Sequence, residues 1–215
     1  MQTEKIIYFV RHGQSLDNAL PVFQSPYSPL TEKGREQAQK IAVRAANISF
    51  DVLISSSFQR AQETAAFIAE ATGKRVETSD FFVERMKPTS VNGKLHGDEA
   101  ANALWKKWEE SLYTPGMRVE DGENFDDIVA RADKALAYLH DRPERSIFVV
   151  THGYFLRTML ARVLVGDALT GEIFKRFQRG AMMENTGLTV LEYQSDDEGA
   201  GRWRLWVYND HAHLG

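Results

Sequence analysis

The 215-residue sequence contains no cysteine. This absence excludes disulfide bonds, thiolate zinc sites and a cysteine nucleophile. The sequence also lacks an apolar run of the roughly 20 residues that a membrane-spanning helix needs. Its first apolar run, residues 6–10, ends at Arg11 and is too short for the core of a secretory signal. We therefore expect a cytoplasmic protein without a membrane partner.

An excess of positive charge is also missing. The chain has 26 lysines and arginines against 30 aspartates and glutamates, a formal net charge of −4. Global electrostatics therefore give no reason to expect a nucleic-acid partner. An anionic substrate would have to be attracted by a local cationic pocket. The apolar fraction of 43% is ordinary for a globular protein, and no linker or repeat divides the chain. We predict a single domain over residues 1–215.

Apolar patterning predicts alternating strands and helices. The expected strands are residues 6–10, 52–54, 76–78, 146–151, 188–193 and 203–208. The first expected helix follows Thr31 as its N-cap and ends at residue 46. The other expected helices cover residues 58–71, 100–111, 125–139 and 154–165. This order is typical of an α/β fold, a three-layer α/β/α sandwich with a mostly parallel central sheet. A hairpin turn at residues 195–201 predicts at least one antiparallel strand.

The pattern is less regular between residues 85 and 122. Proline, asparagine and glycine residues over 85–97 indicate a long surface loop, and a second loop follows the helix at 100–111. We expect this helical and loop insertion to cover the functional site. Trp105 and Trp108 could line its mouth, although their helical spacing is more typical of packing.

Two distant strands each end in a histidine followed by a glycine. One strand runs into Arg11, His12 and Gly13, and the other, residues 146–151, runs into His152 and Gly153. If these two strands are neighbours, they lie about 4.8 Å apart, and both imidazoles then emerge at one edge of the sheet. Ligands of open α/β sheets bind beyond this edge. We expect the glycines to allow close approach of backbone to a ligand. Packing or capping at either strand end is the alternative.

Arginines near these strand ends suit an anionic ligand. Arg11 precedes His12, and a planar guanidinium binds phosphate oxygens in pairs. Arg60 falls in the first turn of the helix at 58–71, where free backbone amides favour an anion. A solvated surface arginine is the alternative there. Asn18 could donate a hydrogen bond to the same oxyanion.

These residues resemble the histidine phosphatase superfamily, which includes phosphoglycerate-mutase-like enzymes, and more closely its phosphatase-type branch. The matching segments occur in order over nearly the whole chain. They are Arg11-His12-Gly13 with Ser15 and Asn18, Ser28-Pro29-Leu30-Thr31, Gly34, Gln37-Ala38, Ser55-Ser56, Arg60-Ala61, Glu63-Thr64-Ala65, Glu84, Thr151-His152-Gly153, Asn209-Asp210 and His213-Leu214.

The resemblance implies a phosphohistidine at His12 and a general acid at Glu84. It also implies a phosphate pocket of Arg11, Arg60 and His152, with Asn18, Ser15 and Gly153 as further substrate contacts. Asp80 and Glu77 remain competitors for the acid. Glu84 follows residues 81–83, which we expect to lie near a strand end.

The expected mechanism needs no cofactor and no metal. Because no metal-binding motif is visible, the two arginines and His152 would neutralise the transferring group in place of magnesium. His12 must be neutral to attack, and neighbouring cations favour that state. His152 would donate to the phosphoryl group while protonated. Glu84 would protonate the leaving alcohol and then deprotonate the attacking water.

Three other functions stay open. In the mutase branch of the resembled family a tryptophan stands where this chain has Asp17, and further departures at residues 24–27 and 86–89 favour hydrolysis. A non-catalytic phosphate-binding regulatory module would follow if Glu84 were misplaced. A metal hydrolase with His12, His152, His211 and His213 as ligands is the third, although a solvated tail explains His211 and His213 better.

The substrate is expected to be a small phosphorylated metabolite. Arg85, Lys87 and Lys94 follow the proposed acid and could meet a second anionic group, but an ordinary solvated basic loop is an equal interpretation. The sequence does not fix the oligomeric state, with a homodimer as the alternative to a monomer.

Overall fold

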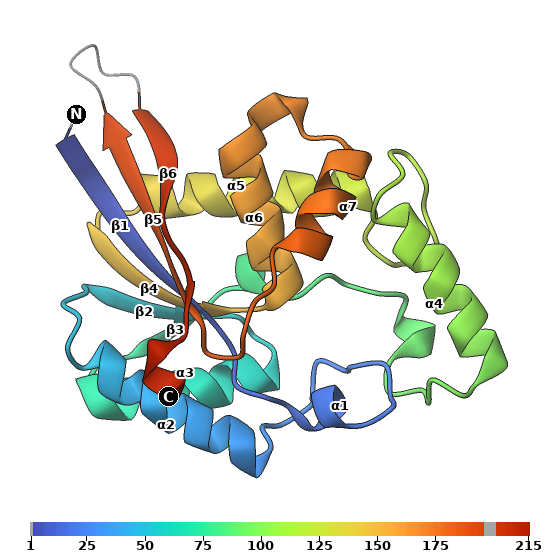
Figure 1. Ribbon diagram of the computed structural model, residues 1–215, viewed down its shortest axis with the longest axis horizontal. Helices are drawn as coiled ribbons and strands as arrows, with labels where there is room; N and C mark the ends of the chain where they lie inside the picture. The colour runs from blue at the N-terminus through green and yellow to red at the C-terminus, as the bar shows by residue number, and fades with distance from the viewer. Residues whose placement is uncertain (1, 196–200) are drawn as a thin grey trace.

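The computed structural model describes residues 2–195 and 201–215 of the chain (Figure 1). Six strands form one sheet in the order β3-β2-β4-β1-β5-β6. Their bounds are Gln2–Arg11 for β1, Val52–Ser55 for β2, Val76–Thr78 for β3, Ser146–Thr151 for β4, Leu188–Ser195 for β5 and Gly201–Asp210 for β6. Strands β3, β2, β4 and β1 pair in parallel, and β5 pairs antiparallel with both β1 and β6. The predicted mixed sheet is confirmed, while the turn at 196–200 lies outside the described residues.

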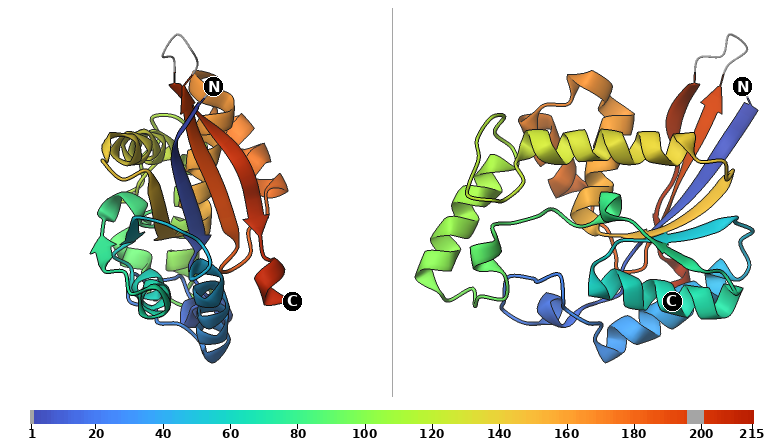
Figure 2. Two further views of the ribbon diagram at one scale, coloured as in Figure 1. Left: turned by 90° about the vertical axis from the view of Figure 1, so that its left-hand side faces the viewer. Right: turned by 180° about the vertical axis from the view of Figure 1, so that it is seen from behind.

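Helices cover both faces of this sheet, as Figures 1 and 2 show. The described part of the chain contains α1 (Leu16–Ala19), α2 (Glu32–Ala45), α3 (Gln59–Thr72), α4 (Glu99–Ser111), α5 (Phe125–Asp141), α6 (Gly153–Val165) and α7 (Gly171–Gly180). Helices α2 and α3 pack on one face, and α5 and α6 on the other. The three-layer α/β/α architecture predicted from the sequence is therefore confirmed.

The two central strands are buried on both faces. Ile147 and Val149 of β4 pack with α5 and α6, while Phe148 and Val150 pack with α2 and α3. Successive side chains of a strand point to opposite faces, so a strand between two helical layers needs apolar residues throughout. This explains why unbroken apolar runs in the sequence predicted the positions of β1 and β4.

The register of β1 and β4 fixes the position of the two histidines. Arg11 lies opposite Thr151, and the amide of His12 donates to the carbonyl oxygen of Thr151 at 3.0 Å. His12 and His152 therefore leave the sheet side by side at the same edge. The spatial neighbourhood predicted from the repeated histidine–glycine ending is confirmed.

Two elements near the site differ from expectation. Helix α7 was not predicted, because its apolar residues stand between many charged ones; Phe174 is nevertheless fully buried. Residues 80–82 form a 3₁₀ turn and not a strand end, because the hydroxyl of Ser79 caps it by accepting from the amide of Phe81. Glu84 therefore follows a tight turn that redirects the chain.

The loop after Glu84 is anchored by packing rather than solvated along its whole length. Val91 is buried against Phe23 and Ala101 of α4, and the amide of Phe23 donates to the carbonyl of Lys94. Helix α4 lies at the far end of the molecule from the C-terminus (Figure 1). That residues 85–122 are an insertion covering the site stays a prediction. None of the described helices is both long and apolar enough to cross a membrane.

Candidate active site

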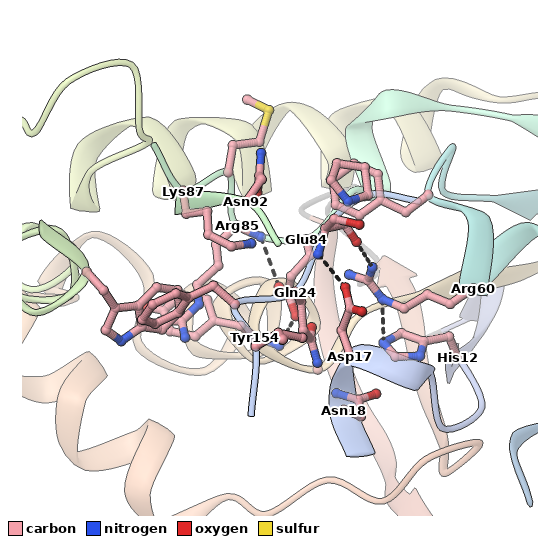
Figure 3. A pocket seen from close by; sticks show the side chains of 18 of the residues that line it. His12, Asp17, Asn18, Gln24, Arg60, Glu84, Arg85, Lys87, Asn92 and Tyr154 are labelled. Atoms are coloured by element: carbon pink, nitrogen blue, oxygen red, sulfur yellow. Dashed lines mark hydrogen bonds between the residues drawn. The ribbon is translucent and has the colours of Figure 1, made fainter. Parts of the chain in front are cut away.

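A cavity of about 540 Å³ opens where β1 and β4 end. Six residues predicted from the sequence line it together: Arg11, His12, Asn18, Arg60, Glu84 and Gly153. Figure 3 shows His12 beside Arg60, with Glu84 between this pair and Arg85 in that view. His152 and Ser15 are fully buried and are not among the lining residues, although the His152 ring lies 4.9 Å from that of His12 between centroids.

The His12 ring is fixed through one of its two nitrogens. Nδ1 lies 2.7 Å from the carbonyl oxygen of Gly13, so we assign the proton to Nδ1 as the donor. Nε2 then carries the lone pair and accepts from Nε of Arg60 at 3.1 Å. This arrangement leaves Nε2 as the nucleophilic nitrogen on the side of Arg60.

The environment of His12 favours its neutral form. The side chain is almost fully buried, and burial lowers its pKa well below the ordinary value, with Arg60 and Arg11 lowering it further. An imidazole that stays neutral needs no general base before it attacks phosphorus. Arg60 and Arg11 are thus the neighbouring cations that were expected to keep His12 neutral.

Close packing against the backbone of α2 explains why residue 13 is a glycine. A Cβ at this position would lie 2.4 Å from the carbonyl oxygen of Gly34 in α2, so only glycine fits. The amide of Gly13 donates to the hydroxyl of Thr64, and the side chain of Asn185 donates to the carbonyl of His12. The approach of Gly34 therefore gives a packing reason for glycine at this position, and close approach of a ligand there stays a prediction.

Only 1% of the Arg60 surface is exposed to solvent, so Arg60 is not a solvated arginine in an early helix turn. Burial lowers its pKa to about 10, while Glu84 and Asp17 oppose that change. The guanidinium stays charged at neutral pH, and its Nη1 donates to the carbonyl of Ser25 at 3.0 Å. A buried cation without a salt bridge is costly, which favours an anion beside it.

Arg11 also keeps hydrogen-bonding capacity unused. Its Nη1 donates to the carbonyl of Met183, whereas its buried Nε has no partner among the described residues. Gly153 leaves room for this side chain, since a Cβ there would lie 3.3 Å from Nε of Arg11. Gly153 thus admits the arginine that faces the ligand, and it also lines the cavity itself.

His152 is held in the opposite way to His12. Its Nε2 lies 2.8 Å from the hydroxyl of Ser56, and its buried Nδ1 has no partner in the described structure. The rings of His12 and His152 are 4.9 Å apart between centroids. Burial lowers the pKa of His152 well below its ordinary value, with Arg60 and His12 adding to the effect. Burial thus favours the neutral form of His152, and its protonation while it faces a phosphoryl dianion stays a prediction.

Asn18 and Ser15 divide their roles. Asn18 lines the cavity, and its Oδ1 accepts from both the amide and the hydroxyl of Ser15. The side-chain nitrogen of Asn18, Nδ2, remains available to donate a hydrogen bond to a ligand. The hydroxyl of the fully buried Ser15 donates to Asn18 and orients it, while a direct contact of Ser15 with a substrate stays a prediction.

The carboxylate of Glu84 is held at the first turn of α6. It accepts from the amides of Tyr154 at 3.2 Å, Phe155 at 3.0 Å and Arg85 at 2.9 Å. Free amides at a helix N-terminus bind anionic groups well, so α6 fixes the carboxylate in the cavity wall.

The two competing acids point elsewhere. Asp80 accepts from the hydroxyl of Ser57, and Glu77 pairs with Arg142 at 2.9 Å. Neither Asp80 nor Glu77 lines the cavity. Glu84 is the one of these three acids that could reach a leaving group.

An ion pair that the sequence analysis missed holds the Glu84 segment. Arg131 of α5 pairs with the buried Glu123 at 2.7 Å and donates to the carbonyls of Phe81, Val83 and Glu84. Glu123 in turn accepts from the amide of Met86. The pair therefore braces the chain on both sides of the proposed acid.

Basic and aromatic residues form the outer wall. The Arg85 guanidinium stacks 4.2 Å from the ring centre of Tyr154 and 5.2 Å from those of Trp105 and Trp108. Trp108 is fully buried and donates to the carbonyl of Glu123, yet both tryptophans line the cavity. Packing and cavity lining are thus not alternatives here.

A sequence profile described as Histidine phosphatase superfamily (branch 1) matches residues 7–209. The chain belongs to this superfamily. The protein named Probable phosphoglycerate mutase GpmB of Enterobacter sp. (strain 638) is 30% identical over 215 residues, covering 97% of this chain and 94% of that protein. The protein of the same name from Yersinia pestis (strain Pestoides F) is 30% identical over 210 residues, with the same coverage.

Solved structures of the superfamily share the fold. A mycobacterial glucosyl-3-phosphoglycerate phosphatase has a TM-score of 0.74 and 26% identity, covering 96% of this chain and 99% of that one. The alpha-ribazole phosphatase from Shigella flexneri has a TM-score of 0.76 at 22% identity, covering 95% of this chain and 96% of that one. The second similarity concerns the fold alone.

Of the two histidines near the C-terminus, His213 is partly buried and hydrogen-bonded, whereas His211 is exposed. His213 lies 3.1 Å from the hydroxyl of Thr186 and 3.4 Å from the guanidinium of Arg44, so the prediction of a solvated tail was wrong for this residue. His211 is exposed, and its Nδ1 lies 2.8 Å from the carbonyl of Asn209. Within the described residues, no group of three histidine or acidic side chains is arranged to hold a metal ion.

Proposed function

We propose that this protein is a metal-independent phosphomonoester hydrolase that forms a phosphohistidine on His12. One observation carries the proposal. A neutral imidazole presents Nε2 at the cavity. Two buried nitrogens near it, Nε of Arg11 and Nδ1 of His152, have no hydrogen-bond partner in the part of the chain that the structure describes. Unpaired buried donors are costly, and the oxygens of a bound phosphoryl group would satisfy them.

In the first step Nε2 of His12 attacks phosphorus as the bond to the ester oxygen breaks. Arg11 and Arg60 neutralise the equatorial oxygens, and His152 donates from Nδ1. Arg60 must exchange its hydrogen bond to Nε2 for one to the substrate. Glu84 gives its proton to the departing alcohol oxygen.

In the second step water attacks the phosphorus of the phosphohistidine. Glu84 takes a proton from this water as the P–N bond breaks, and inorganic phosphate leaves with His12 neutral again. Phosphorus thus exchanges partners twice, and Glu84 returns to its starting protonation state.

Likeness to named proteins supports a phosphatase but does not choose the substrate. The glucosyl-3-phosphoglycerate phosphatase was also solved with VO3, at 26% identity and a TM-score of 0.71. Vanadate is a phosphoryl analogue, so we expect it to inhibit this protein as a competitor of the phosphomonoester.

We expect His12→Ala to reduce turnover of an aryl phosphate by about 10³-fold or more, because no other side chain offers the same nucleophile. Brief reaction of the wild-type protein with ³²P-labelled substrate, followed by a denaturing quench, should leave label that is lost in acid and kept in alkali. Chelator in the assay should not change the rate. Label stable to acid, or a rate that collapses with chelator, would contradict the proposal.

A mutase is the second candidate, favoured by the names of the relatives at 30% identity. Against it, Asp17 lines the cavity where the mutase branch has tryptophan, and its carboxylate accepts from the amide of Ser25 at 2.7 Å. A charged wall retains water, which a mutase must exclude. Isomerisation of 3-phosphoglycerate, with 2,3-bisphosphoglycerate added, faster than phosphate release would favour the mutase. A wild-type protein that binds phosphate without either reaction would be a regulatory module.

A further inference from the structure

The cavity contains more positive charge than the transfer of one phosphoryl group requires. Its cationic lining residues are Arg11, Arg60, Arg85, Lys87 and Arg157, and its carboxylates are Asp17 and Glu84. A phosphomonoester brings close to two negative charges at neutral pH. At least one positive charge is then left without a counter-charge, and two when Glu84 is protonated as the acid.

The two carboxylates do not pair with the outer cations. Asp17 accepts from the amide of Ser25, and Glu84 accepts from backbone amides at the start of α6. The nearest carboxylate to Arg85 is Glu109 at 3.8 Å, whose side chain is 46% exposed on the outer side. Screening by water makes such a pair weak.

Lys87 is the clearest unpaired cation. It is partly buried and lines the cavity, and it makes no hydrogen bond or ion pair within residues 2–195 and 201–215. Burial lowers its pKa to about 8, with Arg60 and Arg85 lowering it further and Glu84 and Asp17 opposing them. An anion bound beside the ammonium group would relieve this unfavourable environment.

Arg85 and Arg157 extend the cationic wall. The stacking of Arg85 on three aromatic rings holds its guanidinium in place before a ligand arrives. Arg157 donates from Nη1 to the carbonyl of Ala181, while its buried Nε has no partner among the described residues. Both arginines and Tyr154 also line a neighbouring cavity of about 800 Å³, which leaves room for the body of a substrate.

We propose that the physiological substrate carries a second anionic oxygen group, a carboxylate or a phosphate, and that Arg85, Lys87 and Arg157 bind it. This proposal rests on the phosphatase function, in which Arg11 and Arg60 hold the first anionic group. In a phosphomonoester the second group belongs to the alcohol part, and Arg85, Lys87 and Arg157 line the same cavity as Glu84, which protonates the leaving alcohol oxygen.

The test compares matched phosphomonoesters with and without the second group, ranked by kcat/KM. The pairs are glycerol 3-phosphate with 3-phosphoglycerate, phosphoethanolamine with phosphoserine, and phenyl phosphate with 4-carboxyphenyl phosphate. Glycerol 1,3-bisphosphate supplies a second phosphate and separates that group from a carboxylate. We expect the ester that carries the second anionic group to be preferred roughly tenfold or more in at least one pair.

Substitution of single lysines tests which residue causes the preference for the second anionic group. Lys87→Gln removes the charge without breaking a hydrogen bond, so we expect the preference to fall roughly tenfold, with a smaller change for the ester lacking the second group. Lys94→Gln is the matched control. Lys94 is exposed on the same loop and does not line the cavity, so the preference should stay as in the wild type.

Each outcome is decisive. Equal kcat/KM within every hydrolysed pair, or equal losses on both partners in Lys87→Gln, overturns the second subsite but leaves the phosphatase intact. No hydrolysis of any ester and no labelled phosphohistidine would instead refute the phosphatase itself, and the second subsite with it.

The preference should also depend on pH. Lys87 is positive below a pKa of about 8 and neutral above it, so the advantage of the second anion should be present at pH 7 and decline through pH 8. Lys87→Arg keeps the charge at higher pH and should retain the preference at pH 9. A preference independent of pH in the wild type, or lost at pH 9 in Lys87→Arg, argues against Lys87 as the binding group.

Discussion

Two histidines in the same local sequence context have opposite hydrogen-bonding states. His12 uses Nδ1 on its own chain and presents Nε2 as an acceptor, whereas His152 uses Nε2 on Ser56 and leaves Nδ1 without a partner. If the hydroxyl of Ser56 donates to Nε2, Nδ1 must carry the proton of the neutral ring. One ring is then suited to attack phosphorus and the other to donate to its oxygen. The difference comes from neighbours that the two histidine–glycine motifs do not share.

Ser56 should therefore act as a positioning residue for His152. We expect Ser56→Ala to lower kcat roughly tenfold, because the ring can then move its proton to Nε2 and lose the donor at Nδ1. Imidazole ¹⁵N shifts should report that change of tautomer. Ser56→Thr keeps the hydroxyl and should restore both readouts. A normal tautomer together with slow turnover in Ser56→Ala would contradict this role.

Among the secondary-structure elements, α5 matters for the site although it contributes no residue to the cavity lining. Its Arg131 reaches across to three carbonyls around Glu84, and the Arg131 guanidinium lies 3.9 Å from the ring centre of Phe155 in α6. The carboxylate of Glu84 is at the same time fixed by α6. The acid is thus placed by two helices that follow it in the chain, which explains how a residue in a loop can be held firmly.

We expect Arg131→Lys to impair general-acid catalysis, because an ammonium group cannot make the same set of hydrogen bonds as the guanidinium. The loss of kcat should be several-fold larger for an alkyl phosphate than for 4-nitrophenyl phosphate, whose leaving group needs little protonation. Arg118→Lys is the control, since Arg118 pairs with Asp127 on the surface with 54% of its side chain exposed. Equal losses on the two substrates would mean that Arg131 only supports the fold.

The residues that the strand ends bring together could be predicted from the sequence. The contacts that long side chains make with distant segments could not. His12 and His152 were predictable neighbours, because parallel strands end at one edge of a sheet. Arg131 stands on an amphipathic helix where arginine is usually solvated, so nothing nearby in the sequence indicated its buried partner Glu123. Helix α7 was missed for a related reason, since only tertiary packing shows which of its few apolar residues are buried.

At the scale of the whole molecule, the site adds unfavourable charge to an otherwise apolar interior. The edge of the sheet buries two histidines and Arg60 between two hydrophobic clusters. Burial of neutral imidazoles costs little at neutral pH, but their protonation in the same place is strongly disfavoured. Folding stability should therefore depend on pH in a range where most proteins change little.

The folded state lowers the pKa of His12 and His152 well below the ordinary value, and that of His213 to about 4. Between these folded values and about 6.5, the unfolded chain binds up to three more protons than the native state. The free energy of unfolding should then fall as pH drops below about 6.5, by up to roughly 1.4 kcal/mol per pH unit for each histidine. Carboxylates do not explain this window. Those with a lowered pKa, which include Asp127, Glu144 and Asp210, have ordinary values of 3.8 to 4.5, so their effect on stability falls at more acidic pH.

Urea unfolding at pH values from 5 to 8 would measure this slope. His213→Gln should remove about a third of the slope. It should leave phosphate release unchanged, because His213 lies against Thr186 and Arg44 and does not line the cavity. A bound phosphate analogue should reduce the remaining slope, since an anion beside His12 and His152 raises the pKa of both rings toward the unfolded value. A free energy of unfolding that stays constant from pH 5 to 6.5 would show that the native state binds protons on these histidines as readily as the unfolded chain does, which would contradict the lowered pKa values of the buried rings.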